Sequence, residues 1–177
     1  QCVRVVLGLP LEYSETDVVS IEAFGKMLVR FGPLKSKTLK NNFLERLRIL
    51  LNCKWFHGEI DTGSSEKMLE GRINGSFLVR LSNRKPGNFT VTRKSSTGKA
   101  VHQRIERKGD ELCVFGKRYQ SLSELMEGEH SHLGVSVAVP GSPYDKIFST
   151  ETSTGKYNYE GDDKGYMNNY DVKSAEF

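Results

Sequence analysis

Gly75-Ser76-Phe77-Leu78-Val79-Arg80-Leu81-Ser82 is an apolar run with one arginine near its centre. Turn-forming residues precede it at Asn74-Gly75 and follow it over residues 82–87, so the run is typical of a central β-strand. An unpaired guanidinium buried in such a strand would cost considerable free energy. Arg80 therefore either pairs with a carboxylate of the same chain or receives an anion from outside.

The residues after this strand favour the second possibility. They offer hydroxyl, amide, cationic and backbone N–H donors in Ser82, Asn83, Arg84 and Lys85. The planar fork of an arginine can hold two phosphate oxygens at once, which a lysine cannot do with the same geometry. We predict a phosphate site formed by Arg80 and this loop, and a buried ion pair remains the alternative.

The neighbouring motifs follow a recognisable order. Trp55-Phe56-His57-Gly58-Glu59-Ile60 stands upstream, and the expected elements are a helix through residues 65–69, strands at 88–93 and 100–105, and a second helix at 120–127. This order, with Trp55–Gly58 and Phe77–Arg80 at this spacing, resembles the Src-homology-2 (SH2) family. The resemblance implies an α+β fold, in which two helices flank a central antiparallel sheet.

The resemblance also implies a phosphotyrosine-binding module, with Arg80 as the buried phosphate ligand and Ser82, Asn83, Arg84 and Lys85 as further contacts. It places His102 and Arg104 beside the tyrosine ring, and strand residues two apart share a face. A packing role for His102 and a solvated sheet edge for Arg104 remain alternatives. Thr62 stands where many members carry a basic residue, so it can offer a hydrogen bond but no charge. We expect Gln103 to influence peptide choice.

We expect three regions: a helical linker-like region at 1–53, the SH2 domain at 54–140 and a C-terminal tail at 141–177. Apolar residues recur at helical spacing in Ser20–Phe31 and Asn42–Cys53. Each such helix needs an apolar neighbour, which predicts a small helical platform packed on the domain.

The flanking regions are similar to a second family. The segments Pro140–Phe148, Gly161–Met167 and Asp17–Phe24 resemble the SH2 end, phosphotyrosine tail and linker of the signal transducer and activator of transcription (STAT) family. That resemblance implies a homodimer in which phosphorylated tails are exchanged reciprocally, after an upstream tyrosine kinase has acted. The candidate phosphorylation sites are Tyr166, Tyr157 and Tyr159. The alternative is an adaptor-like or kinase-linked SH2 domain that docks on phosphotyrosine in other proteins.

Composition excludes several other classes. The formal charge of +4, from 26 basic and 22 acidic residues, argues against nucleic-acid binding by bulk electrostatics. DNA contact is expected only through regions outside this chain, which begins with Gln1 and is expected to be a fragment. Three widely spaced cysteines suggest neither disulfides nor a metal site. Without a nucleotide loop or nucleophile motif, we expect no enzyme activity and no cofactor. No apolar run is long enough to span a bilayer, so we expect no membrane insertion. We expect a cytoplasmic location, with nuclear entry if the chain is STAT-like.

Overall fold

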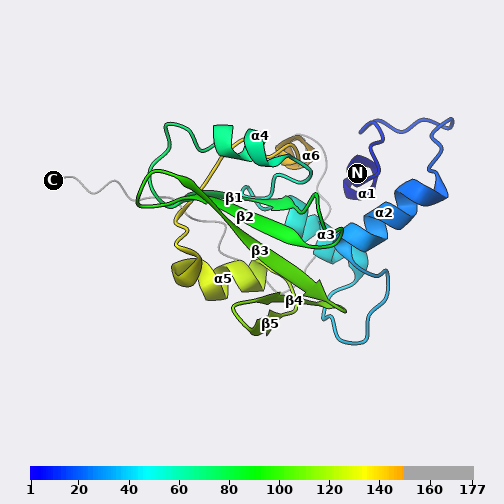
Figure 1. Ribbon diagram of the computed structural model, residues 1–177. Coiled ribbons are helices and arrows are strands. Elements are labelled where there is room, and N and C mark those ends of the chain that lie inside the picture. The colour runs from blue at the N-terminus through cyan, green and yellow to red at the C-terminus, as the bar shows by residue number, and fades with distance from the viewer. Residues whose placement is uncertain (150–177) are drawn as a thin grey trace.

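The computed structural model describes residues 1–149, in which a mixed sheet is flanked by helices (Figure 1). The sheet order is β5-β4-β3-β2-β1-β6. The strands are β1 (Ser76–Leu81), β2 (Phe89–Lys94), β3 (Ala100–Lys108), β4 (Glu111–Val114), β5 (Lys117–Tyr119) and β6 (Val137–Ala138). The helices are α1 (Cys2–Val6), α2 (Ile21–Phe31), α3 (Phe43–Leu51), α4 (Thr62–Lys67), α5 (Leu122–Leu133) and α6 (Asp145–Ser149). Helices α4 and α5 lie on opposite sides of the sheet, so the predicted fold class is confirmed.

Strand β1 is an interior strand of the sheet, between β2 and the short edge strand β6, and all six of its residues are buried. Its one edge pairs with β2 in antiparallel register, and its other edge pairs with two separate segments. The Val79 N–H donates to the Trp55 carbonyl at 2.7 Å, and the His57 N–H donates to the Val79 carbonyl at 2.8 Å. The sequence predicts an antiparallel sheet. Strand β6, however, pairs with the start of β1 in parallel, so the sheet is mixed.

The main core lies on the α5 side of the sheet and extends into the N-terminal helices. Its buried members include Phe56, Val79 and Leu125 from the sheet region and α5, and Met27 and Leu47 from α2 and α3. A smaller cluster of Leu69, Leu78 and Val139 lies on the other side. The predicted packing of the helical platform on the domain is therefore confirmed.

The two predicted platform helices form close to their expected ranges because each has a side-chain cap. The Ser20 side chain accepts a hydrogen bond from the Ala23 N–H, and the Asn42 side chain accepts one from the Glu45 N–H. Both contacts satisfy backbone donors that a helix leaves free in its first turn. Asn42 is thus the cap of α3 and stands outside the helix in which the sequence pattern had placed it.

The segment after β6 packs back on the domain. Ser142 Oγ donates to the Phe56 carbonyl at 2.8 Å, Ile147 is 2% exposed, and the Tyr144 ring stacks on Phe56 with centroids 5.6 Å apart. Gly58 has φ +63°, and a side chain there would begin 2.0 Å from the Tyr144 hydroxyl, so this position requires glycine. The start of the expected tail at 141–177 is therefore packed on the domain, and Tyr144 belongs to this packed segment.

The candidate phosphorylation sites Tyr157, Tyr159 and Tyr166 lie outside the described residues. Within residues 1–149, no helix has the length and apolar character needed to cross a membrane.

Candidate anion-binding site

Arg80 lies in β1 and is 5% exposed. Its register partner in β2 is Thr90, whose partner in β3 is Arg104, so the three residues form one row across the sheet. Above this row stands the start of α4, where Asp61 caps the helix and Thr62 is its first residue. Arg80 Nη2 donates to Thr62 Oγ1 at 2.9 Å. The strand and the helix together aim the guanidinium at the space between them.

The hydrogen-bonding capacity of Arg80 is only partly used. Its Nε atom is buried and has no hydrogen-bond partner in the described part of the chain. A buried donor without a partner is costly, so it requires an explanation, and a bound anion is one that fits a guanidinium. No carboxylate of residues 1–149 lies within ion-pair distance of the Arg80 guanidinium, so an ordinary buried ion pair does not explain its position.

Two carboxylates nevertheless act on Arg80 from a greater distance. Burial lowers the pKa of the Arg80 guanidinium, and the attraction of Asp61 and Glu66 opposes that effect. A dianionic phosphate would supply a much stronger partner for the same group, because charge-assisted hydrogen bonds are the strongest kind. The arrangement is therefore compatible with binding of an anion at Arg80.

His102 faces the same space from β3. Its Nδ1 lies 3.1 Å from Thr92 Oγ1, and its Nε2 lies 3.0 Å from Glu66 Oε1. Because strand residues alternate in direction, His102 and Arg104 share the face of Arg80. The side chain of His102 is 30% exposed, so the structure leaves both ring contact and packing open as its role.

The loop after β1 is closed by its own backbone. The Ser82 N–H donates to the Asn88 carbonyl at 2.9 Å, and the Lys85 N–H donates to Ser82 Oγ at 3.4 Å. The side chains of Asn83, Arg84 and Lys85 are exposed. Their free amide and cationic groups remain candidates for contacts with an anion at Arg80.

Gln103 does not belong to this face. It pairs with Val91 in the register of β2 and β3, so its side chain lies on the α5 side of the sheet. Its Nε2 donates to the Arg104 carbonyl at 3.0 Å. The structure therefore separates Gln103 from the Arg80 site, and its role in peptide choice stays a prediction.

The carboxylates of Asp61 and Glu66 were not predicted as part of the site. For Glu66 the sequence holds a signal, because it follows Thr62 by four residues and therefore lies on the same face of α4. Asp61 precedes the helix as its cap. No group of three or more potential metal ligands occurs in residues 1–149.

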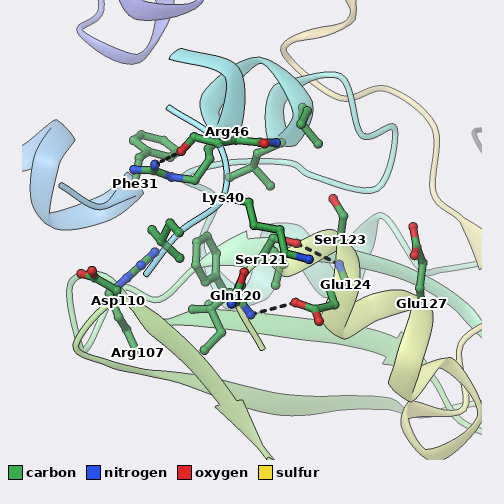
Figure 2. A pocket seen from close by; sticks show the side chains of 17 residues that line it. Phe31, Lys40, Arg46, Arg107, Asp110, Gln120, Ser121, Ser123, Glu124 and Glu127 are labelled. Atoms are coloured by element: carbon green, nitrogen blue, oxygen red, sulfur yellow. Dashed lines mark hydrogen bonds between the residues drawn. The ribbon is translucent and has the colours of Figure 1, made fainter. Parts of the chain in front are cut away.

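A separate cavity of about 340 Å³ lies where the N-terminal helices meet the domain. Figure 2 shows Arg46 on the helical side and Gln120, Ser121 and Glu124 on the α5 side. Phe89 and Arg107 contribute from β2 and β3. Arg80 does not line this cavity, so the two sites are distinct.

Comparison with known proteins finds relatives for part or most of this chain. The family model described as "SH2 domain" matches residues 55–128. Dual specificity protein kinase shkA of Dictyostelium discoideum is 35% identical over 159 residues, which are 89% of this chain and 30% of the kinase. Ras GTPase-activating protein 1 of Rattus norvegicus is 36% identical over 100 residues, which are 53% of this chain and 10% of that protein.

A solved structure, that of the SH2 domain of a Monosiga brevicollis CRK/CRKL homolog, matches with 21% identity and a TM-score of 0.46 over 50% of this chain and 88% of that one. The chain spans less than a third of the length of shkA and a tenth of the Ras GTPase-activating protein. With the Arg80 site formed between β1, β3 and the first helix of the matched segment, residues 55–128 of this chain are an SH2 domain.

Proposed function

We propose that this chain docks on phosphotyrosine-containing segments of other proteins, and that Arg80 receives the phosphate. The observation that carries the proposal is the buried, unpartnered Nε of Arg80 beside an Nη2 held by Thr62. A phosphate entering between α4 and the sheet would meet this guanidinium first. Arg104, His102 and the exposed cations of the loop would surround the phenol ring and the remaining oxygens.

Docking on other proteins is favoured over reciprocal tail exchange. The relatives described above are a protein kinase and a Ras GTPase-activating protein, and the alignment with shkA extends well beyond residues 55–128 into the flanking regions. The STAT resemblance of these flanking regions finds no support in such relatives. The packing of residues 142–147 on the domain also leaves less of the expected tail free for exchange.

Isothermal titration with a phosphotyrosine peptide and its unphosphorylated form tests the proposal. We expect binding of the phosphorylated form alone, and a loss of at least about a hundredfold for Arg80→Ala, since truncating a buried charged contact costs several kcal/mol. Arg80→Lys keeps the charge but loses the fork, so its affinity should be intermediate. The control is Arg118→Ala, because Arg118 pairs with Glu111 in the β4–β5 hairpin. Equal binding by wild type and Arg80→Ala would exclude Arg80 as the phosphate ligand.

Tail exchange is tested separately by solution mass. The chain is phosphorylated with a tyrosine kinase and compared with Tyr166→Phe. We expect the phosphorylated chain to stay monomeric. A dimer that Tyr166→Phe and Arg80→Ala both abolish would instead establish the STAT-like mechanism.

A further inference from the structure

The loop that follows β1, residues 82–88, touches the N-terminal helical region through its last residues. Gly87 has φ +84°, a conformation that residues with side chains rarely adopt. A side chain at Gly87 would begin only 2.8 Å from the Val29 carbonyl oxygen in the last turn of α2. The backbone of the loop and the C-terminal end of α2 therefore meet closely, although almost sixty residues separate them.

One arginine of β3 contacts both partners. Arg107 Nε donates to the Gly87 carbonyl at 3.1 Å, and its Nη2 donates to the Arg30 carbonyl at 3.4 Å. The Arg107 backbone N–H donates to Asn88 Oδ1 at 3.0 Å. The last carbonyls of a helix have no partner within the helix, and they attract cations. Arg107 thus joins the end of α2 to the end of the loop.

The side-chain hydrogen bonds of Arg107 go to the loop and to the end of α2, and its other neighbours are an aromatic ring and a carboxylate. Its guanidinium lies 5.8 Å from the centre of the Phe89 ring, and burial lowers its pKa. Figure 2 shows Arg107 beside Asp110 at the edge of the cavity. Asp110 attracts the Arg107 guanidinium electrostatically, which opposes the effect of burial on its pKa, but the hydrogen bonds that Asp110 accepts come from Ser36 at 2.5 Å and Thr38 at 3.1 Å.

The contacts continue from the end of the loop to the anion site. Asn88 follows Gly87 directly, and its carbonyl accepts a hydrogen bond from the Ser82 N–H at 2.9 Å. Ser82 in turn lies two residues after Arg80. We infer that Arg107 is a positioning residue, which holds the phosphate-binding loop 82–88 against the end of α2 in the conformation that receives the ligand. This inference rests on the proposed phosphotyrosine binding. A loop that is ordered before binding raises affinity, because less conformational entropy is lost on association.

The test begins with Arg107→Met, which keeps an apolar stem against Phe89 and removes both side-chain hydrogen bonds. The matched control is Lys108→Met, which removes the same charge from the adjacent, exposed residue. We expect the phosphopeptide Kd to rise roughly tenfold for Arg107→Met and less than about twofold for Lys108→Met. Arg107→Lys should rescue part of the loss, because one ammonium cannot reproduce the fork. If Arg107→Met fails to fold, the phosphopeptide Kd of Arg107→Lys serves as the test in its place.

A double-mutant cycle separates positioning from a general structural defect. In a chain that already carries Arg84→Ala and Lys85→Ala, Arg107→Met should have a much smaller effect, because the loop it positions contributes less. An unchanged tenfold effect in that background would overturn the inference.

Hydrogen exchange provides the readout that does not depend on binding. Arg107→Met should accelerate amide exchange in residues 82–88 and 29–32 while the remaining strands keep their protection. If the wild-type chain binds no phosphotyrosine peptide, the proposed function fails. The amide exchange rates of residues 82–88 then still show whether Arg107 holds the loop against α2. Unchanged exchange in the loop would show that Arg107 does not hold it.

Discussion

Arg80 Nη2 donates to Thr62 Oγ1 at 2.9 Å, which joins strand β1 of the sheet to the first residue of α4. The contact orients a guanidinium that is 5% exposed and whose Nε has no partner in the described chain. Thr62 thus contributes a neutral acceptor where a basic residue would have contributed charge. It holds the arginine in place without competing for the anion.

Thr62→Val should destabilise the fold, because it removes this acceptor with little change in shape and leaves a part-buried donor unsatisfied. We expect the free energy of unfolding to fall by about 1 kcal/mol in urea titrations. Thr62→Ser keeps the hydroxyl and should remain within about 0.5 kcal/mol of wild type. Equal losses for the two variants would mean that the hydroxyl is not the stabilising group.

Glu66→Gln should strengthen phosphopeptide binding. The Glu66 carboxylate lies 3.0 Å from His102 at the mouth of the site, where it would repel an incoming dianionic phosphate. We expect an affinity gain on the order of threefold at low salt, which shrinks as added salt screens the repulsion.

Glu70→Gln is the matched control for this prediction. It makes the same change of charge just beyond the C-terminal end of α4, while Arg80 contacts the opposite end of the helix. A weaker affinity for Glu66→Gln would show that Glu66 assists binding, by orienting His102.

The sequence was sufficient to predict that Arg80 is buried in a β-strand, because the apolar residues of Phe77–Leu81 surround it, and the phosphate site built on it stays a prediction. The helical spacing of apolar residues likewise placed α2 and α3 close to their observed ranges, although Ser20 and Asn42 prove to be caps that precede the helices. The first helix of the domain was less accurately predicted. It begins at Thr62, because Asp61 caps it, and its first residues Thr62–Ser65 are polar and show no apolar periodicity.

Other features left little trace in the sequence. Strands β4 and β5 have four and three residues, too few to reveal an alternating pattern. The contacts of Arg107 go to main-chain carbonyls 20 and 77 residues away, and any residue type can supply a carbonyl. Such contacts become visible only once the fold has brought the segments together.

The His57 side chain should make stability depend on pH in the mildly acidic range. His57 is 1% exposed, its Nε2 lies 3.0 Å from the Val139 carbonyl oxygen, and burial lowers its pKa below the ordinary 6.5. The unfolded chain therefore binds a proton more readily, so stability is complete above pH 6.5 and falls as the pH drops toward the lowered value.

Urea unfolding at pH 7.5 and 5.5 measures this effect. The slope due to His57 is limited to about 1.4 kcal/mol per pH unit. His57→Gln should be less stable at pH 7.5 but should show a smaller fall between the two pH values. His130→Gln, at an exposed position, should keep the wild-type fall. If His57→Gln also shows the full wild-type fall in stability, a group other than His57 causes the pH dependence between pH 7.5 and 5.5.

The Glu129 cluster should govern stability at more acidic pH. Glu129 is 1% exposed in α5, where Oε1 lies 2.7 Å from Lys117 Nζ and accepts from the Tyr119 hydroxyl, and Oε2 lies 2.7 Å from His132 Nδ1. The hydrogen bond from Lys117 is the main cause that lowers the pKa of Glu129 to about 2. The depressed pKa stabilises the fold above the ordinary value of 4.5, and this contribution is lost as the pH falls from 4.5 toward 2.

Glu129→Gln should therefore lower the midpoint of thermal unfolding at pH 7, whereas Glu127→Gln, at an exposed position of the same helix, should change it little. The gap between Glu129→Gln and wild type should narrow steadily below pH 4.5, because the wild-type carboxylate becomes protonated and loses its attraction for Lys117. Calorimetric scans between pH 7 and 2.5 measure both curves. A gap that stays constant over this range would mean that Glu129 stabilises α5 by packing and hydrogen bonding that do not require its charge.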